Sequence, residues 1–211
     1  MTNNPRRGLL DGMADIVGDL WGAPEAPAPT PAPESTYTAP PVVLPFAQLW
    51  KTADEPIDWT DALASPTPTD GLTSPEKWTL YHQHAASVLR GDLKAYLAVL
   101  RAANPMADLT PYADTIDVTA QNADTLRATF TARADLLTED RKGYLCGMAV
   151  RIARDLFAVL PVTRVAVEAA YESASLLSVT FDKADMNKVR FAFIDPVEFT
   201  VQCGGVFTKE E

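Results

Sequence analysis

The chain has few of the residues on which metal sites and disulfide frameworks depend. Its 211 residues include two cysteines and two histidines. Cys146 and Cys203 lie far apart and have no metal-ligand spacing, so we expect neither a zinc site nor a disulfide, and free thiols suit a reducing compartment. His82 and His84 are two apart, which on a helix directs them about 200° from each other. We expect a packed or rim His82, a solvated His84 and no bound metal.

Basic residues are also scarce relative to acidic ones. Lys and Arg number 18 against 28 Asp and Glu, for a net charge of −10. The first 45 residues contain two Arg, three Asp and two Glu, so they carry −3 and the remainder carries −7. Both parts would repel a phosphate backbone, and the composition therefore argues against a nucleic-acid partner.

Long apolar runs are missing as well. No segment approaches the roughly 20 apolar residues that cross a bilayer. An export signal after Arg6 and Arg7 would need an uncharged apolar run, but Asp11, Asp15 and Asp19 interrupt it. We therefore expect a cytoplasmic protein without a transmembrane segment.

The common catalytic motifs do not occur in this sequence. It contains no glycine-rich phosphate loop, no Gly-x-Ser-x-Gly elbow and no His-Glu-x-x-His pair. Metal-dependent nucleases place a lysine two residues from an acidic residue on a strand, and neither Glu168 nor Asp182 has one there. The sequence thus predicts no catalytic residue and no cofactor.

A short amphipathic segment spans residues 6–22, within a predicted N-terminal helix over 1–22. One face of that helix is apolar, and Asp11, Asp15 and Asp19 stack on the opposite side. Gly12 and Gly18 each cost about 1 kcal/mol relative to alanine, so the helix is marginal in water and needs a surface for its apolar face. The predicted protein-docking residues are Leu9, Leu10, Met13, Ile16, Val17, Leu20 and Trp21.

A Pro/Ala-rich linker follows over residues 23–45. Eight prolines between Gly22 and Pro45 exclude a helix or a central strand there. In polyproline geometry of about 3.1 Å per residue, this stretch reaches roughly 70 Å. That reach permits docking on a protein partner, on a second copy or on the chain's own domain, and the pattern does not choose among them. The acidic polar face disfavours a membrane surface.

Residues 46–211 are predicted to form a single α+β domain. Ser74 and Pro75 begin a helix that Gly91 ends, and Asp92 begins a second that ends before Asn104 and Pro105. Two hairpins, about four strands, are expected in an antiparallel sheet packed with several helices. The strand-like runs are 116–118, 126–130, 165–171 and 176–181, the long helix spans 138–160, and a short helix near 185–191 precedes a loop at 195–196.

The polar side of the 138–160 helix carries the least weak group of candidate site residues, Tyr144, Arg151, Arg154 and Asp155. Arg151 and Asp155 are four apart, and an ordinary surface ion pair is the favoured interpretation over an anion or catalytic site. A catalytic site would require these side chains to line a pocket near Glu168 or Asp182. Cys146, at the edge of the apolar stripe, is expected to be an inert buried thiol.

The chain contains a series of short motifs: Ile57–Trp59, Val88–Asp92 with Tyr96–Leu97, Ala103–Pro105, Tyr144–Cys146, Arg151–Asp155, Phe157–Val162, Leu176–Asp182 and Ile194–Pro196. In this order they resemble the C-terminal module of a family of bacterial proteins of unknown function. The resemblance covers roughly residues 46–207 and implies one domain without a nameable activity. Family members tend to have histidine at the position of Glu168 and a longer hairpin loop at 172–175.

Three functional hypotheses follow. The leading one is a noncatalytic binding or adaptor domain, tethered to a protein partner or self-associating through residues 6–22. The second is an enzyme of unknown class with a site on the polar face of the 138–160 helix. The third is a cargo or structural component of a shell or phage particle, for which the helix would be a packaging tag.

Overall fold

The computed structural model describes residues 46–69, 73–138 and 140–208. The chain divides into two units, Met1–Pro41 and Val42–Glu211, and every described residue belongs to the second. The predicted docking helix and the Pro/Ala-rich linker lie outside the described residues. Within them, no helix is both long and apolar enough to cross a membrane.

Short helices precede the sheet. The Ser74 side chain accepts a hydrogen bond from the Lys77 N–H at 3.4 Å, and Asp92 accepts one from the Lys94 N–H at 2.8 Å, so both predicted helix starts are confirmed. The sequence pattern did not predict the helix that Asp58 caps. These elements are η1 (Phe46–Lys51), α2 (Trp59–Ala64), α3 (Pro75–Leu89), α4 (Leu93–Ala103) and η2 (Ala107–Leu109).

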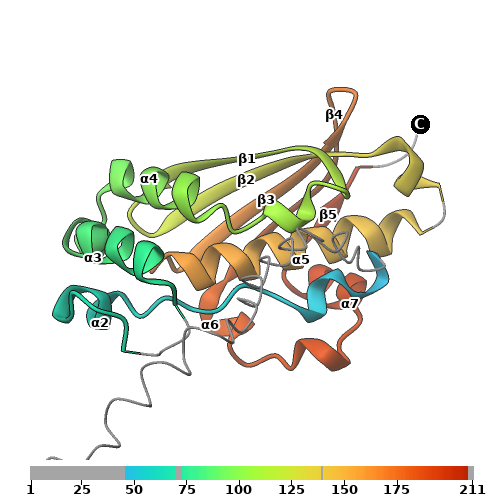
Figure 1. Ribbon diagram of the computed structural model, residues 1–211. Helices are drawn as coiled ribbons and strands as arrows, with labels where there is room; N and C mark the ends of the chain where they lie inside the picture. Colours follow the sequence, from blue (N-terminus) through green and yellow to red (C-terminus); the bar gives the residue numbers. More distant parts are fainter. Residues whose placement is uncertain (1–45, 70–72, 139, 209–211) are drawn as a thin grey trace, which may run out of the picture. The chain divides into compact units, whose positions relative to one another are not determined.

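A five-stranded mixed sheet forms one layer of the domain, and helices pack against it, which confirms the α+β class (Figure 1). Both predicted hairpins are present, as antiparallel pairs β1–β2 and β3–β4. Two features differ from the prediction of a four-stranded antiparallel sheet: β2 pairs with β3 in parallel, and a short fifth strand pairs with β4. The strands are β1 (Ala113–Asn122), β2 (Thr125–Ala132), β3 (Arg164–Tyr171), β4 (Ala174–Asp182) and β5 (Val206–Phe207).

The two faces of the sheet differ because side chains alternate along each strand. Leu126, Ala128 and Phe130 of β2 are fully buried, whereas Arg127 and its face neighbours keep contact with solvent. The strand register carries this division across the sheet, since Phe130 pairs with Ala169 and Arg127 with Ala166. One face therefore builds the core and the other is open.

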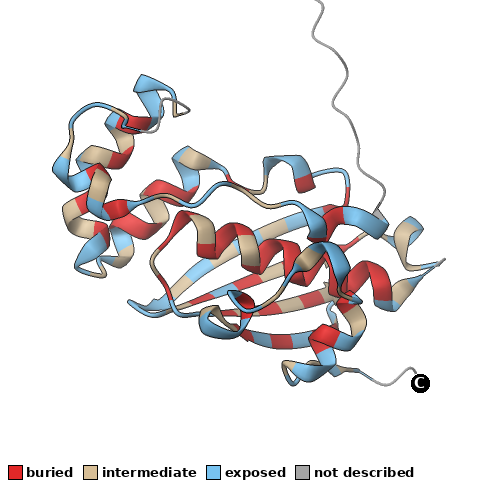
Figure 2. Ribbon diagram, turned by 90° about the horizontal axis from the view of Figure 1, so that it is seen from below, coloured by how far each residue is buried: buried red, intermediate tan, exposed pale blue. Residues whose placement is uncertain are grey.

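Helix α5 (Arg141–Val159) crosses the core face and supplies the connection from β2 to β3 that their parallel pairing requires. Asp140 caps it by accepting a hydrogen bond from the Gly143 N–H at 2.9 Å. Fifteen of its 19 residues are buried, because η1 and α7 pack on the side away from the sheet (Figures 1 and 2). The helix predicted over 138–160 is confirmed and is more deeply buried than an amphipathic surface helix.

The C-terminal part differs most from the prediction. The helix expected near 185–191 is two short pieces, and Asp195 with Pro196 begins a helix where the sequence indicated a loop. Asp195 accepts a hydrogen bond from the Val197 N–H at 2.7 Å, as an N-cap does. The remaining elements are η3 (Ala134–Leu137), α6 (Lys183–Met186), η4 (Phe191–Phe193) and α7 (Pro196–Gln202).

Candidate functional site

Arg151 and Asp155 form a buried ion pair on α5. The Arg151 Nε atom lies 3.0 Å from Asp155 Oδ1 and 2.7 Å from Oδ2. The two side chains are only 4% and 0% exposed. The interpretation favoured from the sequence, a surface ion pair, is therefore wrong. Helical spacing shows which residues share a face, but it does not show what packs over that face.

The remaining guanidinium nitrogens of Arg151 are engaged by two other segments. Nη1 donates to the Thr52 hydroxyl at 2.7 Å, just after η1, and Nη2 donates to Asp108 Oδ2 at 3.0 Å, in η2. The single arginine thus joins α5 to segments that precede the sheet. This use of all three nitrogens is typical of a structural tie.

Burial dominates the electrostatics of Asp155. Loss of hydration raises the pKa of Asp155 to about 7, although Arg151 and the backbone N–H of Asp54, 2.9 Å from Oδ1, both favour the carboxylate. The same carboxylate holds the loop at Asp54 through that N–H group. The pair therefore fixes the path of the chain between η1 and α2.

Arg154 holds the same segment from the next position on α5. Its Nη1 atom donates to the carbonyl oxygens of Trp50 and, at 3.0 Å, of Thr52. Its guanidinium carbon lies 4.1 Å from the ring centroid of Phe191, in η4. Burial lowers the pKa of Arg154. Arg154 therefore also packs structural elements together.

Tyr144 bonds to different partners. Its hydroxyl donates to the Tyr112 carbonyl oxygen and accepts from the Arg133 N–H at 3.2 Å. The side chain is fully buried, and burial raises the pKa of Tyr144. The structure thus joins Arg151 to Asp155, places Arg154 beside them on the shared segment, and leaves Tyr144 in a separate contact with the end of β2.

Glu168 and Asp182 do not join this group. Glu168 pairs with Arg127 on the open face of the sheet, and Asp182 pairs with Arg164 at 3.0 Å. Both ion pairs are partly or largely exposed. An enzyme site on the polar side of α5 would have needed one of these acids close to Arg151 and Asp155 in a shared pocket.

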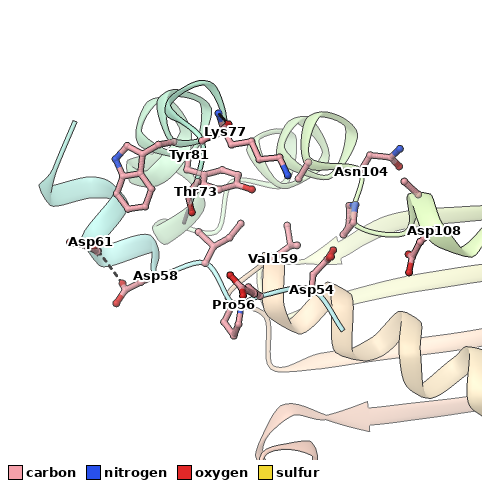
Figure 3. Close-up of a pocket in the computed structure, with 17 residues that line it drawn as sticks. Asp54, Pro56, Asp58, Asp61, Thr73, Lys77, Tyr81, Asn104, Asp108 and Val159 are labelled. Carbon is pink, nitrogen blue, oxygen red and sulfur yellow. Dashed lines mark hydrogen bonds between the residues drawn. The ribbon is translucent and has the colours of Figure 1, made fainter. Parts of the chain in front are cut away.

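A cleft of about 750 Å³ lies beside this buried cluster (Figure 3). Its walls come from the loop before α2, from α2 and α3, and from the segment after α4. The charged and phenolic side chains in its lining are Asp54, Glu55, Asp58, Asp61, Lys77, Tyr81 and Asp108. The volume lies within the range of about 300–1,000 Å³ usual for ligand pockets.

The side chains in the middle of the cleft influence one another. Burial raises the pKa of Asp54, and the nearby Asp108 carboxylate raises it further, against the effect of Arg151 and Lys77. Burial and the Asp54 charge also raise the pKa of Tyr81. Asp108 belongs both to the cleft and to the buried cluster, through its ion pair with Arg151.

This cleft was not predicted from the sequence. Its charged residues come from four separate segments, and none of them matches a spacing rule. The one available signal was the abundance of acidic residues between positions 54 and 61, in Asp54, Glu55, Asp58 and Asp61. Such abundance is common on solvated loops and therefore indicates no site by itself.

The cysteine and histidine predictions have mixed outcomes. Cys146 is buried as expected, and burial raises its pKa to about 11, which favours the protonated thiol over the reactive thiolate. His82 is half-buried, as expected for a residue at the rim, and its Nδ1 atom lies 2.7 Å from the Ala62 carbonyl oxygen. His84 was expected to be solvated but is also half-buried. In the part of the chain that the structure describes, no three His, Cys, Asp or Glu residues are placed to hold a metal ion.

Comparisons with protein-family models, with curated proteins and with solved structures found no match to this chain. The resemblance to the C-terminal module of bacterial proteins over residues 46–207 therefore stays a prediction. The predicted protein-docking residues between Leu9 and Trp21 lie outside the described residues, so their role is a prediction as well.

Proposed function

We propose that this chain is a noncatalytic binding or adaptor protein, positioned on a protein partner by residues 6–22. The observation that carries the proposal is the burial of Arg151 and Asp155. The polar group that offered a focus for catalysis binds the protein's own backbone and side chains, with side-chain exposures of 4% and 0%. A substrate would have to break those contacts to reach them.

The sequence of residues 6–22 supports the docking part of the proposal. Its seven apolar side chains share one helical face, and burying each gives about 1.5–3 kcal/mol. The gross gain of roughly 10–20 kcal/mol is largely offset by the cost of ordering a marginal helix and of association. A micromolar interaction with an apolar groove is the expected result.

Paired substitutions on the two faces of the segment test this function. Ile16→Ser with Leu20→Ser weakens the apolar face, while Asp15→Ser with Asp19→Ser changes the polar face of the same helix and is the matched control. Each full-length variant is tagged and purified from the native host, and the co-purifying proteins are quantified. We expect one set of partners to be lost with the apolar-face variant and kept with the control.

A synthetic peptide of residues 6–22 completes the test. It should compete with the full chain for the partner identified by co-purification, because the docking contacts lie within it. Sedimentation velocity of the full chain separates self-association from binding to another protein. Equal partner recovery from both double variants, or a peptide that does not compete, would refute the proposal.

A further inference from the structure

The acidic cleft carries five carboxylates and one ammonium group. Asp54, Glu55, Asp58, Asp61 and Asp108 all contribute to its lining, against Lys77 alone. Carboxylates gathered in a concave, partly dehydrated site attract cations more strongly than the same charges on an open surface. Acidity alone selects only the sign of a ligand, so its chemical class has to come from the other lining groups.

Tyr81 provides an independent observation. The residue is only 8% exposed, and within the described residues its hydroxyl has no hydrogen-bond partner. Figure 3 shows this hydroxyl directed into the cleft, between Lys77 and Val159. Because no described residue bonds to this phenolic oxygen at the cleft surface, it can accept a hydrogen bond from an N–H donor in the cleft.

The half-buried Asp54 offers a second acceptor in the cleft. Its backbone N–H is bound to Asp155, but its carboxylate makes no hydrogen bond or ion pair with the rest of the described chain. Asp54 and Tyr81 are close enough that the Asp54 charge raises the pKa of Tyr81. Together they form a site for one charged N–H donor.

The acids lie at two ends of the cleft. In Figure 3, Asp58 and Asp61 lie at one end and Asp54 and Asp108 at the other, with Tyr81 and Val159 between them. Ile57 and Trp78 add further apolar lining. Two negative ends joined by an apolar middle match a chain of methylene groups with an ammonium at each end. A single metal ion would instead need its ligands around one point.

We propose that this cleft binds a linear aliphatic diamine or polyamine. One ammonium group donates to Asp54 and Tyr81, the methylene chain packs on Ile57 and Val159, and the second ammonium group lies between Asp58 and Asp61. The ammonium of Lys77 lies in the same space, so the ligand binds against its repulsion. None of the residues that carry this proposal belongs to 6–22, so it does not rest on the docking proposed for them.

Isothermal titration calorimetry of the full chain with putrescine at low ionic strength tests the proposal. We expect Asp54→Asn to weaken binding about tenfold, the usual effect of removing a hydrogen bond to a charged group. Tyr81→Phe should weaken it about threefold, because the ring stays and only the hydroxyl is lost. Lys77→Met should strengthen binding, because it removes a like charge from the cleft.

The matched control is Asp117→Asn. Asp117 is exposed on β1, outside the cleft lining, and its loss changes the net charge as much as the loss of Asp54 does. Its affinity for putrescine should equal that of the unchanged chain. Circular dichroism of every variant checks folding, and the opposite sign expected for Lys77→Met distinguishes a lost contact from a damaged fold.

Three results would overturn the proposal. They are equal weakening by Asp54→Asn and Asp117→Asn, binding of butylamine as tight as that of putrescine, and displacement of putrescine by Mg²⁺ at the same concentration. The Ile16→Ser, Leu20→Ser variant should bind putrescine normally. The proposal for the cleft and the proposal for residues 6–22 are therefore tested independently.

Discussion

At the scale of single residues, Arg151 explains why the candidate site was only partly predictable. The sequence correctly grouped Arg151 with Asp155, because four-residue spacing on a helix brings two side chains together. It did not predict their burial, since Thr52 and Asp108 are brought to the pair by chain segments far away in the sequence. Tertiary covering of a helix face has no local signature.

Removing Arg151 should be strongly destabilising. At about pH 8, Arg151→Met leaves the Asp155 carboxylate buried without its partner, so the free energy of unfolding in urea should fall by about 3–5 kcal/mol. Arg164→Met is the control, because its ion pair with Asp182 is exposed, and it should change stability by less than about 1 kcal/mol. A double Arg151→Met, Asp155→Leu variant should recover part of the loss. Similar effects of the two single changes would contradict a structural role for the buried pair.

Asp155 should also make stability depend on pH in a defined direction. The pKa of Asp155 is 3.8 in the unfolded chain and about 7 in the folded one. Between about pH 4 and pH 7 the folded state therefore keeps a proton on Asp155 that the unfolded state has lost. The contribution of this protonation to the free energy of unfolding is fully present below about pH 4 and is lost as the pH rises towards 7. Relative to Asp155→Asn, the free energy of unfolding should therefore fall with rising pH, by at most about 1.4 kcal/mol per pH unit. Urea titrations of both proteins at several pH values check this, and a difference that rises with pH would contradict it.

At the scale of elements, the sequence was most informative where local chemistry decides. Ser74 and Asp92 were predicted as helix starts because their side chains cap the first turn, and the structure has them in that role. The same rule should have identified Asp195 with Pro196 as the start of α7. The parallel pairing of β2 with β3 was missed, although the sequence predicted a long helix between the two strands, which is the connection that a parallel pair needs.

The turn between α3 and α4 gives a prediction at this scale. Gly91 has a φ of +75°, and a Cβ there would lie 2.5 Å from the Ala123 Cβ, whereas at Gly204, with φ +81°, it would meet open space. Gly204→Ala should thus lower the free energy of unfolding by about 1–2 kcal/mol, through backbone strain alone. Gly91→Ala should lower it by more, because the new Cβ also clashes with Ala123. In the double variant Gly91→Ala, Ala123→Gly the clash is removed, so the loss of unfolding free energy should equal that of Gly204→Ala. Urea unfolding of the four proteins measures this, and equal losses for the two single alanine variants would exclude the steric contribution.

At the scale of the whole molecule, the described helices cover one face of the sheet and leave the other face uncovered. The core face is filled from both hairpins, while the open face carries short polar side chains and the Arg127–Glu168 ion pair. On this face the Glu168 carboxylate is paired with Arg127, far from the Arg151–Asp155 pair on the core side.

The crossover through α5 also has a consequence for how quickly the domain folds. Each hairpin closes through a very short turn, at Ala123 and Asp124 and at Glu172 and Ser173, so both can form within microseconds. The β2–β3 pair forms only after the whole intervening stretch has been gathered, and the entropy lost in closing that loop precedes any gain from the contacts it makes. We therefore expect the slow step of folding to be the pairing of β2 with β3, because it requires α5 to pack on the sheet.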